Sequence, residues 1–230
     1  MTDRPILFSG PMVRALIAGT KKQTRRTLNP QPFIDASGNF CAPDRKGKVW
    51  NWGQQCDGRP CVRNYIDSEL RIKVGDQLYV REHWRCHYTL DQTAPRDLPP
   101  EIALTFVADG DSSIHQHSAG RFRQGMHMPR WASRITLKVT DVRVERLQGI
   151  SDADALAEGV AVEHGLPADV HRHYVEIGNG EVVSGWDARD CYGNLWEHIN
   201  GGGTWAANPW VAAYTFTVRL GNVDGERCQP

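Results

Sequence analysis

The stretch "SRITLKVTDVRVERL", residues 133–147, is the clearest strand pattern in the chain and decides the class of fold. Apolar residues alternate with polar ones in its first half, at Ile135, Leu137 and Val139. Such alternation is typical of a strand with one buried face. It shifts by one position before Val142, and this shift predicts a β-bulge near Asp141. The sequence therefore indicates a long strand within a sheet.

Three other segments have strand character. Residues 77–81, "QLYVR", alternate apolar and polar side chains directly after a tight turn at residues 74–76. Residues 214–220, "YTFTVRL", do the same near the end of the chain. A further strand is expected within "IALTFVADG", residues 102–110, because it ends in a turn signal.

Two short helices are expected beside these strands. The first begins at Pro11, which suits the first helical turn, and Gly19 is placed to end it. The second begins after Ser151, a good N-cap residue, with Asp154 three residues later as in a capping box. Gly159 can terminate this second helix.

Three irregular stretches separate these elements, at residues 29–69, 86–128 and 161–190. They show little periodicity and contain many turn-forming residues, so we interpret them as insertions. A brief helix is expected after the third, over residues 194–200. Short strands with few short helices indicate an α+β protein, built on a small β-barrel rather than a βαβ sheet. We expect residues 1–230 to form one domain with these insertions.

The charges of the chain cancel, since it has 27 basic and 27 acidic side chains. Without net charge it lacks the field of a strongly basic nucleic-acid binder, and tight nonspecific DNA binding is not expected. The sequence has no apolar run of the roughly 18 to 20 residues that cross a membrane, and no secretory signal. We therefore expect a cytoplasmic protein whose six cysteines are free thiols.

No metal or other cofactor is expected. The closely spaced pairs of potential ligands do not form a set with the spacing of a zinc site. These pairs are Cys56 and Cys61, His115 and His117, and His171 and His173. The sequence also has no Gly-rich phosphate loop.

The stretch "AGTKKQTRR", residues 18–26, follows the first expected helix and carries the main candidate for chemistry. A threonine hydroxyl such as that of Thr24 needs a base, and Lys21 can act as one only if its pKa lies well below the usual value of about 10.4. Three neighbouring cations favour such a shift, at Lys22, Arg25 and Arg26. The plain alternative is a set of solvated side chains at a helix end.

Other candidate site residues are scattered along the chain. Glu158 precedes Gly159 at the negative end of the second helix, a position that suits a general acid. Three residues could hydrogen-bond and stack a base, namely Glu82, Trp84 and Trp131. The ordinary alternatives are an exposed glutamate for Glu158 and core packing for the tryptophans. Arg26 is a candidate for polarising a substrate carbonyl.

The order of these pieces resembles the ASCH domain of the PUA-like superfamily, in particular the bacterial amidohydrolases that remove the acyl group from N4-acetylcytidine. In that family a pattern Ala-Gly-x-Lys-x-x-Thr-x-Arg follows the first helix, and Lys21 and Thr24 match it. The resemblance implies that Lys21 is the proton acceptor, Thr24 the nucleophile and Glu158 the proton donor. The chain also resembles longer phage-associated ASCH proteins, in segments that include "HMPRWASRITL" and "ANPW".

The resemblance implies an amidohydrolase acting on the exocyclic amide of N4-acylcytosine nucleosides, with a small nucleoside as its partner. Because insertions such as those at residues 29–69 and 86–128 could widen the acyl pocket, we expect acyl groups larger than acetyl to be accepted. The alternative is a noncatalytic module that reads a modified base in RNA or DNA, which the basic residues 121–146 favour. A nuclease is a weaker alternative, because no histidine has a recognisable general-base setting.

Overall fold

The centre of the protein is a five-stranded sheet. The computed structural model describes residues 2–44, 46–52, 62–110, 118–163 and 172–225. The strands of this sheet, in spatial order, are β1 (Asp3–Leu7), β6 (Gln77–Arg81), β9 (Ile135–Arg146), β13 (Trp210–Leu220) and β2 (Gln23–Thr27). β1 and β6 pair in parallel, and the other neighbours are antiparallel.

Strand β9 confirms the prediction made from residues 133–147. It pairs with β13 along its whole length, and the register shifts between Thr215 and Phe216, which lie opposite Asp141 and Val139. One residue of β9 is therefore extra at this point, which is the expected bulge. Its apolar face is buried, at Ile135, Leu137, Val139, Val142 and Val144. The strands expected at residues 77–81 and 214–220 are β6 and the end of β13.

The sheet is open within the part of the chain that the structure describes. β1 and β2 are its two edges, and no pairing between described residues joins them. The α+β class is confirmed, since the strands in the described residues are accompanied by four α-helices, α1 (Gly10–Ile17), α2 (Val62–Glu69), α3 (Asp152–Ala157) and α4 (Ala188–Asn200). The small barrel expected from the sequence is not found as a closed sheet among these residues.

The short helices form where local signals predicted them. Helix α1 has Pro11 in its first turn and buries Val13 and Leu16. Helix α3 is capped by Ser151, whose hydroxyl accepts a hydrogen bond from the backbone N–H of Asp154 at 3.1 Å. These contacts fix where α1 and α3 begin, and the candidate site residues Lys21, Thr24 and Glu158 follow their C-terminal ends.

The three insertions contain more regular structure than the sequence indicated. The first holds the sheet of β3 (Phe33–Ile34), β4 (Phe40–Pro43) and β5 (Val49–Asn51), followed by α2. In and beside the second, β7 (Trp84–Arg85) pairs with β8 (Thr105–Phe106), so the strand expected within residues 102–110 is only two residues long. The third holds the sheet of β10 (Ala161–Glu163), β11 (Arg172–Gly178) and β12 (Glu181–Gly185). The expectation of irregular chain was wrong for these strands, because segments of two to seven residues show no clear period.

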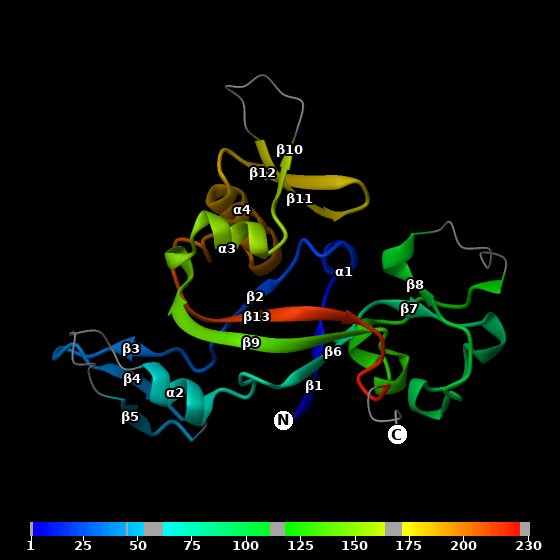
Figure 1. Ribbon diagram of the computed structural model, residues 1–230, viewed down its shortest axis with the longest axis horizontal. Coiled ribbons are helices and arrows are strands. Elements are labelled where there is room, and N and C mark those ends of the chain that lie inside the picture. The colour runs from blue at the N-terminus through cyan, green and yellow to red at the C-terminus, as the bar shows by residue number, and fades with distance from the viewer. Residues whose placement is uncertain (1, 45, 53–61, 111–117, 164–171, 226–230) are drawn as a thin grey trace.

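Figure 1 shows how the insertions surround the central strands β9 and β13. The sheet of β3, β4 and β5 lies at one end together with α2. Strands β7 and β8 lie at the other end, and the sheet of β10, β11 and β12 lies above α3 and α4.

Helix α4 is longer than the helix expected over residues 194–200. It begins at Ala188, because the side chain of Asp187 caps it by accepting a hydrogen bond from the N–H of Asp190.

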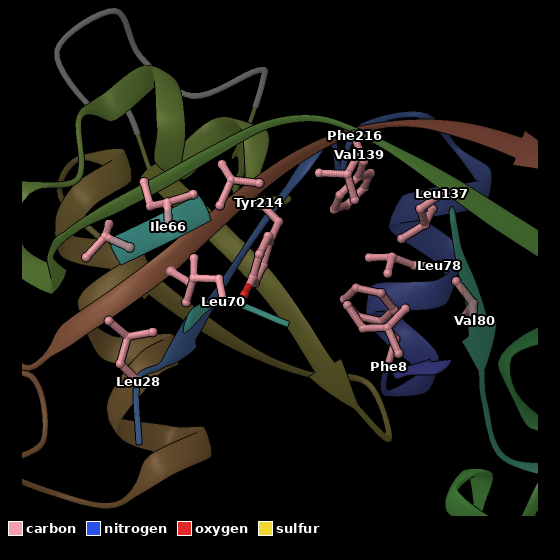
Figure 2. Packing of buried hydrophobic residues seen from close by; sticks show 14 of the residues in the cluster. Phe8, Leu28, Ile66, Leu70, Leu78, Val80, Leu137, Val139, Tyr214 and Phe216 are labelled. Carbon is pink, nitrogen blue, oxygen red and sulfur yellow. The ribbon is translucent and has the colours of Figure 1, made fainter. Parts of the chain in front are cut away.

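Three buried clusters hold these parts together. The largest joins the central sheet to α1 and α2, and Figure 2 shows Phe8, Leu78 and Leu137 in one part of it and Tyr214 and Leu70 in another. The second packs α3 and α4 against β11 and β12, and the third lies around Trp84. Free, buried thiols are found at Cys41, Cys86 and Cys191.

In the described part of the chain no helix combines the length and the apolar character needed to span a bilayer.

Candidate active site

A cavity of about 310 Å³ lies between the end of β1, the start of α1, strand β2 and helix α4. Thr24, Arg26 and Glu158 all line it. Its volume is at the lower end of the range for small-molecule sites, about 300 to 1,000 Å³. The structure therefore gathers three of the sequence-predicted site residues at one hollow suited to a small ligand.

Lys21 and Glu158 form a buried pair, of which Glu158 lines this cavity and Lys21 lies behind it. The Lys21 ammonium nitrogen donates to Glu158 Oε2 at 2.8 Å and to the Glu158 backbone oxygen at 2.7 Å. Lys21 is 1% exposed and Glu158 is 5% exposed. The pair forms because the ends of α1 and α3 meet, and the backbone N–H of Lys22 donates to Ala157 O at 2.7 Å.

Gly159 permits this meeting of the two helix ends. Its φ is +106°, a conformation that residues with a Cβ rarely adopt, and a Cβ there would lie 3.6 Å from the Cβ of Lys21. The glycine that was predicted to end the second helix therefore also turns the chain away just beyond Glu158.

The pKa of Lys21 is lowered from its ordinary value, chiefly because burial removes water from the ammonium group. The charge of Glu158 opposes this shift, and the charges of Arg26 and Arg25 add to it. The sequence argument gave the neighbouring cations first place and included Lys22, which is exposed. Burial is the larger cause.

Arg25 lines the cavity as well and connects three carboxylates. Its Nη1 donates to Glu158 Oε1 at 3.2 Å and its Nη2 donates to Glu145 Oε1 at 2.7 Å. Its Nη2 also lies 3.2 Å from Asp154 Oδ2, and its side chain is fully buried. A buried guanidinium is stable only when its donors are satisfied in this way. Arg25 and Lys21 bind different oxygens of Glu158, so together they hold its carboxylate in place.

The variant Arg25→Met is expected to lower the free energy of unfolding by about 3–5 kcal/mol, because it leaves buried carboxylates without their partner. Arg143 is a matched control, since its side chain contacts Asp154 and Glu145 but is 39% exposed. Arg143→Met should cost at most about 1 kcal/mol. Urea unfolding of both variants measures the difference, and equal losses would contradict the role given to Arg25.

Thr24 and Arg26 occupy alternate positions of β2. Thr24 is 3% exposed and pairs across the sheet with Tyr214. Arg26 is exposed, its Nη2 donates to Leu7 O at 2.8 Å, and its guanidinium lies 5.4 Å from the centre of the Phe8 ring. Since residues two apart on a strand share a face, the hydroxyl and the guanidinium lie along the same face of β2.

Helix α4 supplies site residues that the sequence did not indicate. Tyr192 and Trp196 line the cavity, and Tyr192 is 4% exposed. The pKa of Tyr192 is raised well above its usual value by burial, then by the charge of Glu158, with a side-chain hydrogen bond to Glu158 contributing as well. This phenol therefore stays protonated. The Asp187 cap and the apolar spacing of Cys191, Leu195 and Trp196 could have revealed the helix, but not what it packs against.

Glu82, Trp84 and Trp131 do not line the cavity. Glu82 is 1% exposed and accepts two hydrogen bonds from Arg134, at 2.9 and 3.0 Å. Trp84 is fully buried in the third cluster, against which Trp131 packs. His83, which stands between Glu82 and Trp84, lines the cavity instead. Successive side chains after β6 alternate in direction, so the sequence argument chose the wrong side of this segment.

Several arginines of the basic stretch 121–146 are engaged within the protein, whereas Arg121 is exposed. Arg130 bonds to Asp3 and Asp224. Arg134 bonds to Glu82 and Asp109, and Arg123 donates to backbone carbonyl oxygens. Side chains occupied in this way are less available to a phosphate backbone, which weakens the case for a nucleic-acid surface.

Among the residues described, no group of three or more His, Cys, Asp or Glu side chains could hold a metal ion. Several of the cysteines and histidines considered as ligands lie outside the described residues, namely Cys56, Cys61, His115, His117 and His171.

Comparison of the chain with protein-family models, with curated proteins and with solved structures gave no match.

Proposed function

We propose that the protein is an amidohydrolase that cleaves the exocyclic amide of N4-acylcytosine nucleosides, giving a cytosine nucleoside and a carboxylic acid. The observation that carries the proposal is the buried Lys21–Glu158 pair at a cavity that Thr24 lines. These are the three residues that the resemblance to ASCH amidohydrolases assigns to catalysis. The order of the elements, α1 leading into β2 and β9 leading into α3, supports the same PUA-like relationship.

The pair supplies a base and an acid from one shared proton. An ammonium beside a carboxylate and an amine beside a carboxylic acid hold the same number of protons, and a 2.8 Å hydrogen bond connects the two forms. Burial favours the neutral form and Arg25 favours the ionised form. In the neutral form Lys21 accepts the proton of the Thr24 hydroxyl, and Glu158 donates its own proton to the departing cytosine amine.

Acyl transfer then leaves an ester on Thr24, with Lys21 protonated and Glu158 ionised. Water attacks this ester, and its proton passes to Glu158 while Lys21 returns a proton to the threonine oxygen. The carboxylic acid leaves and the pair regains its starting state. The two half-reactions thus use the same groups in opposite roles.

One donor at the cavity can stabilise charge on a substrate oxygen. The exposed guanidinium of Arg26 is fixed by Leu7 O and lies against the Phe8 ring. The phenol O–H of Tyr192 is directed to Glu158 and helps to position that carboxyl group. Oriented donors in a partly dry site are effective for negative charge that develops on a carbonyl oxygen.

Space for a larger acyl group lies beyond Glu158. A second cavity of about 230 Å³ shares Met12, Glu158 and Leu195 with the first. Its far wall includes Tyr174 and Val175 of the third insertion. Residues described in the first two insertions do not line the first cavity, so the extra room comes from a different insertion than the sequence suggested.

We expect the kcat/KM for N4-butyrylcytidine to be at least as high as that for N4-acetylcytidine, because the second cavity can bury the two added methylenes, each worth about 0.8 kcal/mol. A series of acyl chain lengths measures this ratio. Ala161→Trp, which fills the second cavity, should lower the ratio of butyryl to acetyl turnover. Strict preference for acetyl in the unmodified protein would contradict the expectation.

The proposed function is tested by following the ultraviolet absorbance of N4-acetylcytidine in the presence of the protein. Conversion to cytidine is expected. A titration with RNA and DNA at several salt concentrations, run beside it, tests the noncatalytic alternative. Binding of a nucleic acid without any loss of N4-acetylcytidine would overturn the amidohydrolase proposal.

A further inference from the structure

His83 is a cavity residue whose tautomer is fixed by a backbone contact. The N–H of Gly125 donates to His83 Nδ1 at 3.0 Å. A backbone N–H can only donate, so Nδ1 must be the unprotonated nitrogen of the ring. The neutral imidazole therefore carries its hydrogen on Nε2, which makes Nε2 a donor.

The second insertion holds this imidazole in place. The ring of Phe122 lies 4.8 Å from the His83 ring, centre to centre. Gly125 can reach the histidine only because it has no side chain. A Cβ there would lie 2.7 Å from Leu7 Cδ1 and 2.9 Å from the backbone carbon of Glu82. The close approach of residues 122–125 thus fixes both the tautomer and the position of the ring.

The Nε2–H group of His83 needs an acceptor, and a bound ligand can provide one. Among the described residues none is hydrogen-bonded to His83 Nε2, while the ring lines the cavity beside apolar Leu7 and Met12. A donor on an otherwise apolar part of a ligand site commonly fixes the orientation of the ligand.

We propose that His83 is a specificity-determining residue whose Nε2–H binds an acceptor atom of the substrate's pyrimidine ring, the C2 carbonyl oxygen. The second insertion then contributes to recognition through the tautomer of His83, without lining the cavity itself. This inference rests on the proposed function, since it names the part of the N4-acylcytosine nucleoside that the site recognises. It leaves Arg26 for the acyl carbonyl.

Three variants distinguish the hydrogen-bonding contributions of the two ring nitrogens. His83→Gln places an amide donor near the position of Nε2, His83→Asn keeps a polar group near Nδ1 but has no donor that reaches the position of Nε2, and His83→Leu removes both. Loss of one hydrogen bond between neutral groups should raise KM roughly three- to tenfold in the Asn and Leu variants, with kcat little changed. The Gln variant should restore part of the loss.

His87→Asn is the matched control, because His87 is exposed, makes a similar local contact through Nδ1 to Thr89 Oγ1 at 2.7 Å, and does not line the cavity. Its KM should equal that of the unmodified protein. Heteronuclear NMR of the imidazole nitrogens should show Nε2 protonated and Nδ1 unprotonated in His83. The reverse tautomer would overturn the inference.

The same measurements made with N4-acetylcytosine, which lacks the sugar, locate the acceptor. Persistence of the KM effect supports an acceptor on the ring, and its disappearance overturns that assignment.

If the protein hydrolyses N4-acetylcytidine but the Asn and Leu variants keep the KM of the unmodified protein, the inference about His83 fails and the proposed function stands. If nothing is hydrolysed, the proposed function fails. The role of His83 is then tested by calorimetric measurement of cytidine binding to the unmodified protein and the variants. Weaker binding in the Asn and Leu variants then supports it, and equal or absent binding overturns it.

Discussion

Thr24→Ala is expected to lower kcat for the hydrolysis of N4-acetylcytidine by about a thousandfold or more, because the variant lacks the oxygen that attacks the acyl carbon. Thr24 lines the cavity and is 3% exposed, so the lost hydroxyl opens little space in the core. The free energy of unfolding should change by at most about 1 kcal/mol. Ultraviolet absorbance follows the reaction, and urea unfolding follows the stability.

Two other threonine variants sharpen the interpretation of this loss. Thr24→Ser keeps a hydroxyl and should retain measurable turnover. Thr217→Ala removes an exposed threonine of β13 that lies outside the cavity, and it should behave as the unmodified protein. Turnover by Thr24→Ala within tenfold of the unmodified protein would show that water attacks directly and that Thr24 has no nucleophilic role.

Lys21→Met is expected to reduce kcat/KM by about a hundred- to ten thousandfold, the range attributed to a general base. The buried carboxylate of Glu158 would also lose its 2.8 Å partner, although the contact with Arg25 remains. Some loss of stability should therefore accompany the loss of activity. The double variant Lys21→Met with Glu158→Gln removes both charges, and it should recover stability without recovering turnover.

The pH dependence of kcat/KM adds an independent readout for the same pair. Turnover needs one proton shared between Lys21 and Glu158, so the rate must fall when the pair loses that proton. Burial lowers the pKa of Lys21, and the descending limb should lie below the 10.5 of an ordinary lysine. Lys22→Met, which changes an exposed neighbour, should leave the profile unchanged. Near-normal activity of Lys21→Met across this range would remove the proposed base.

Much of the central sheet could be predicted because its signals are local. β9 shows its period over 12 residues, and its bulge appears as a one-position shift in the same pattern. Helix α3 carries its own cap at Ser151. By contrast, β10, β11 and β12 are short strands whose stability comes from packing on α4, and no local period marks them. Whether a sheet closes into a barrel or stays open depends on contacts between distant strands, which the pattern of single strands does not specify.

The candidate site likewise contains residues that local sequence signals indicated and residues that only tertiary packing brings to it. Lys21 and Thr24 belong to one short motif at the end of α1, and Glu158 stands at a recognisable helix end, so the sequence could propose all three. Tyr192 reaches them only through the packing of α4, which a linear pattern does not reveal. At β6 the choice between His83 and its neighbours depended on which side of the chain faces the cavity, and the sequence is ambiguous there because all of these side chains are polar or aromatic.

A crystal structure of the Thr24→Ala variant with N4-acetylcytidine bound tests the central claim most directly. The account predicts the nucleoside in the first cavity, its acyl carbon about 3–3.5 Å from where the Thr24 oxygen would lie, and its exocyclic nitrogen within hydrogen-bond distance of Glu158. An acyl group directed away from residue 24, or a nucleoside bound outside this cavity, would contradict it.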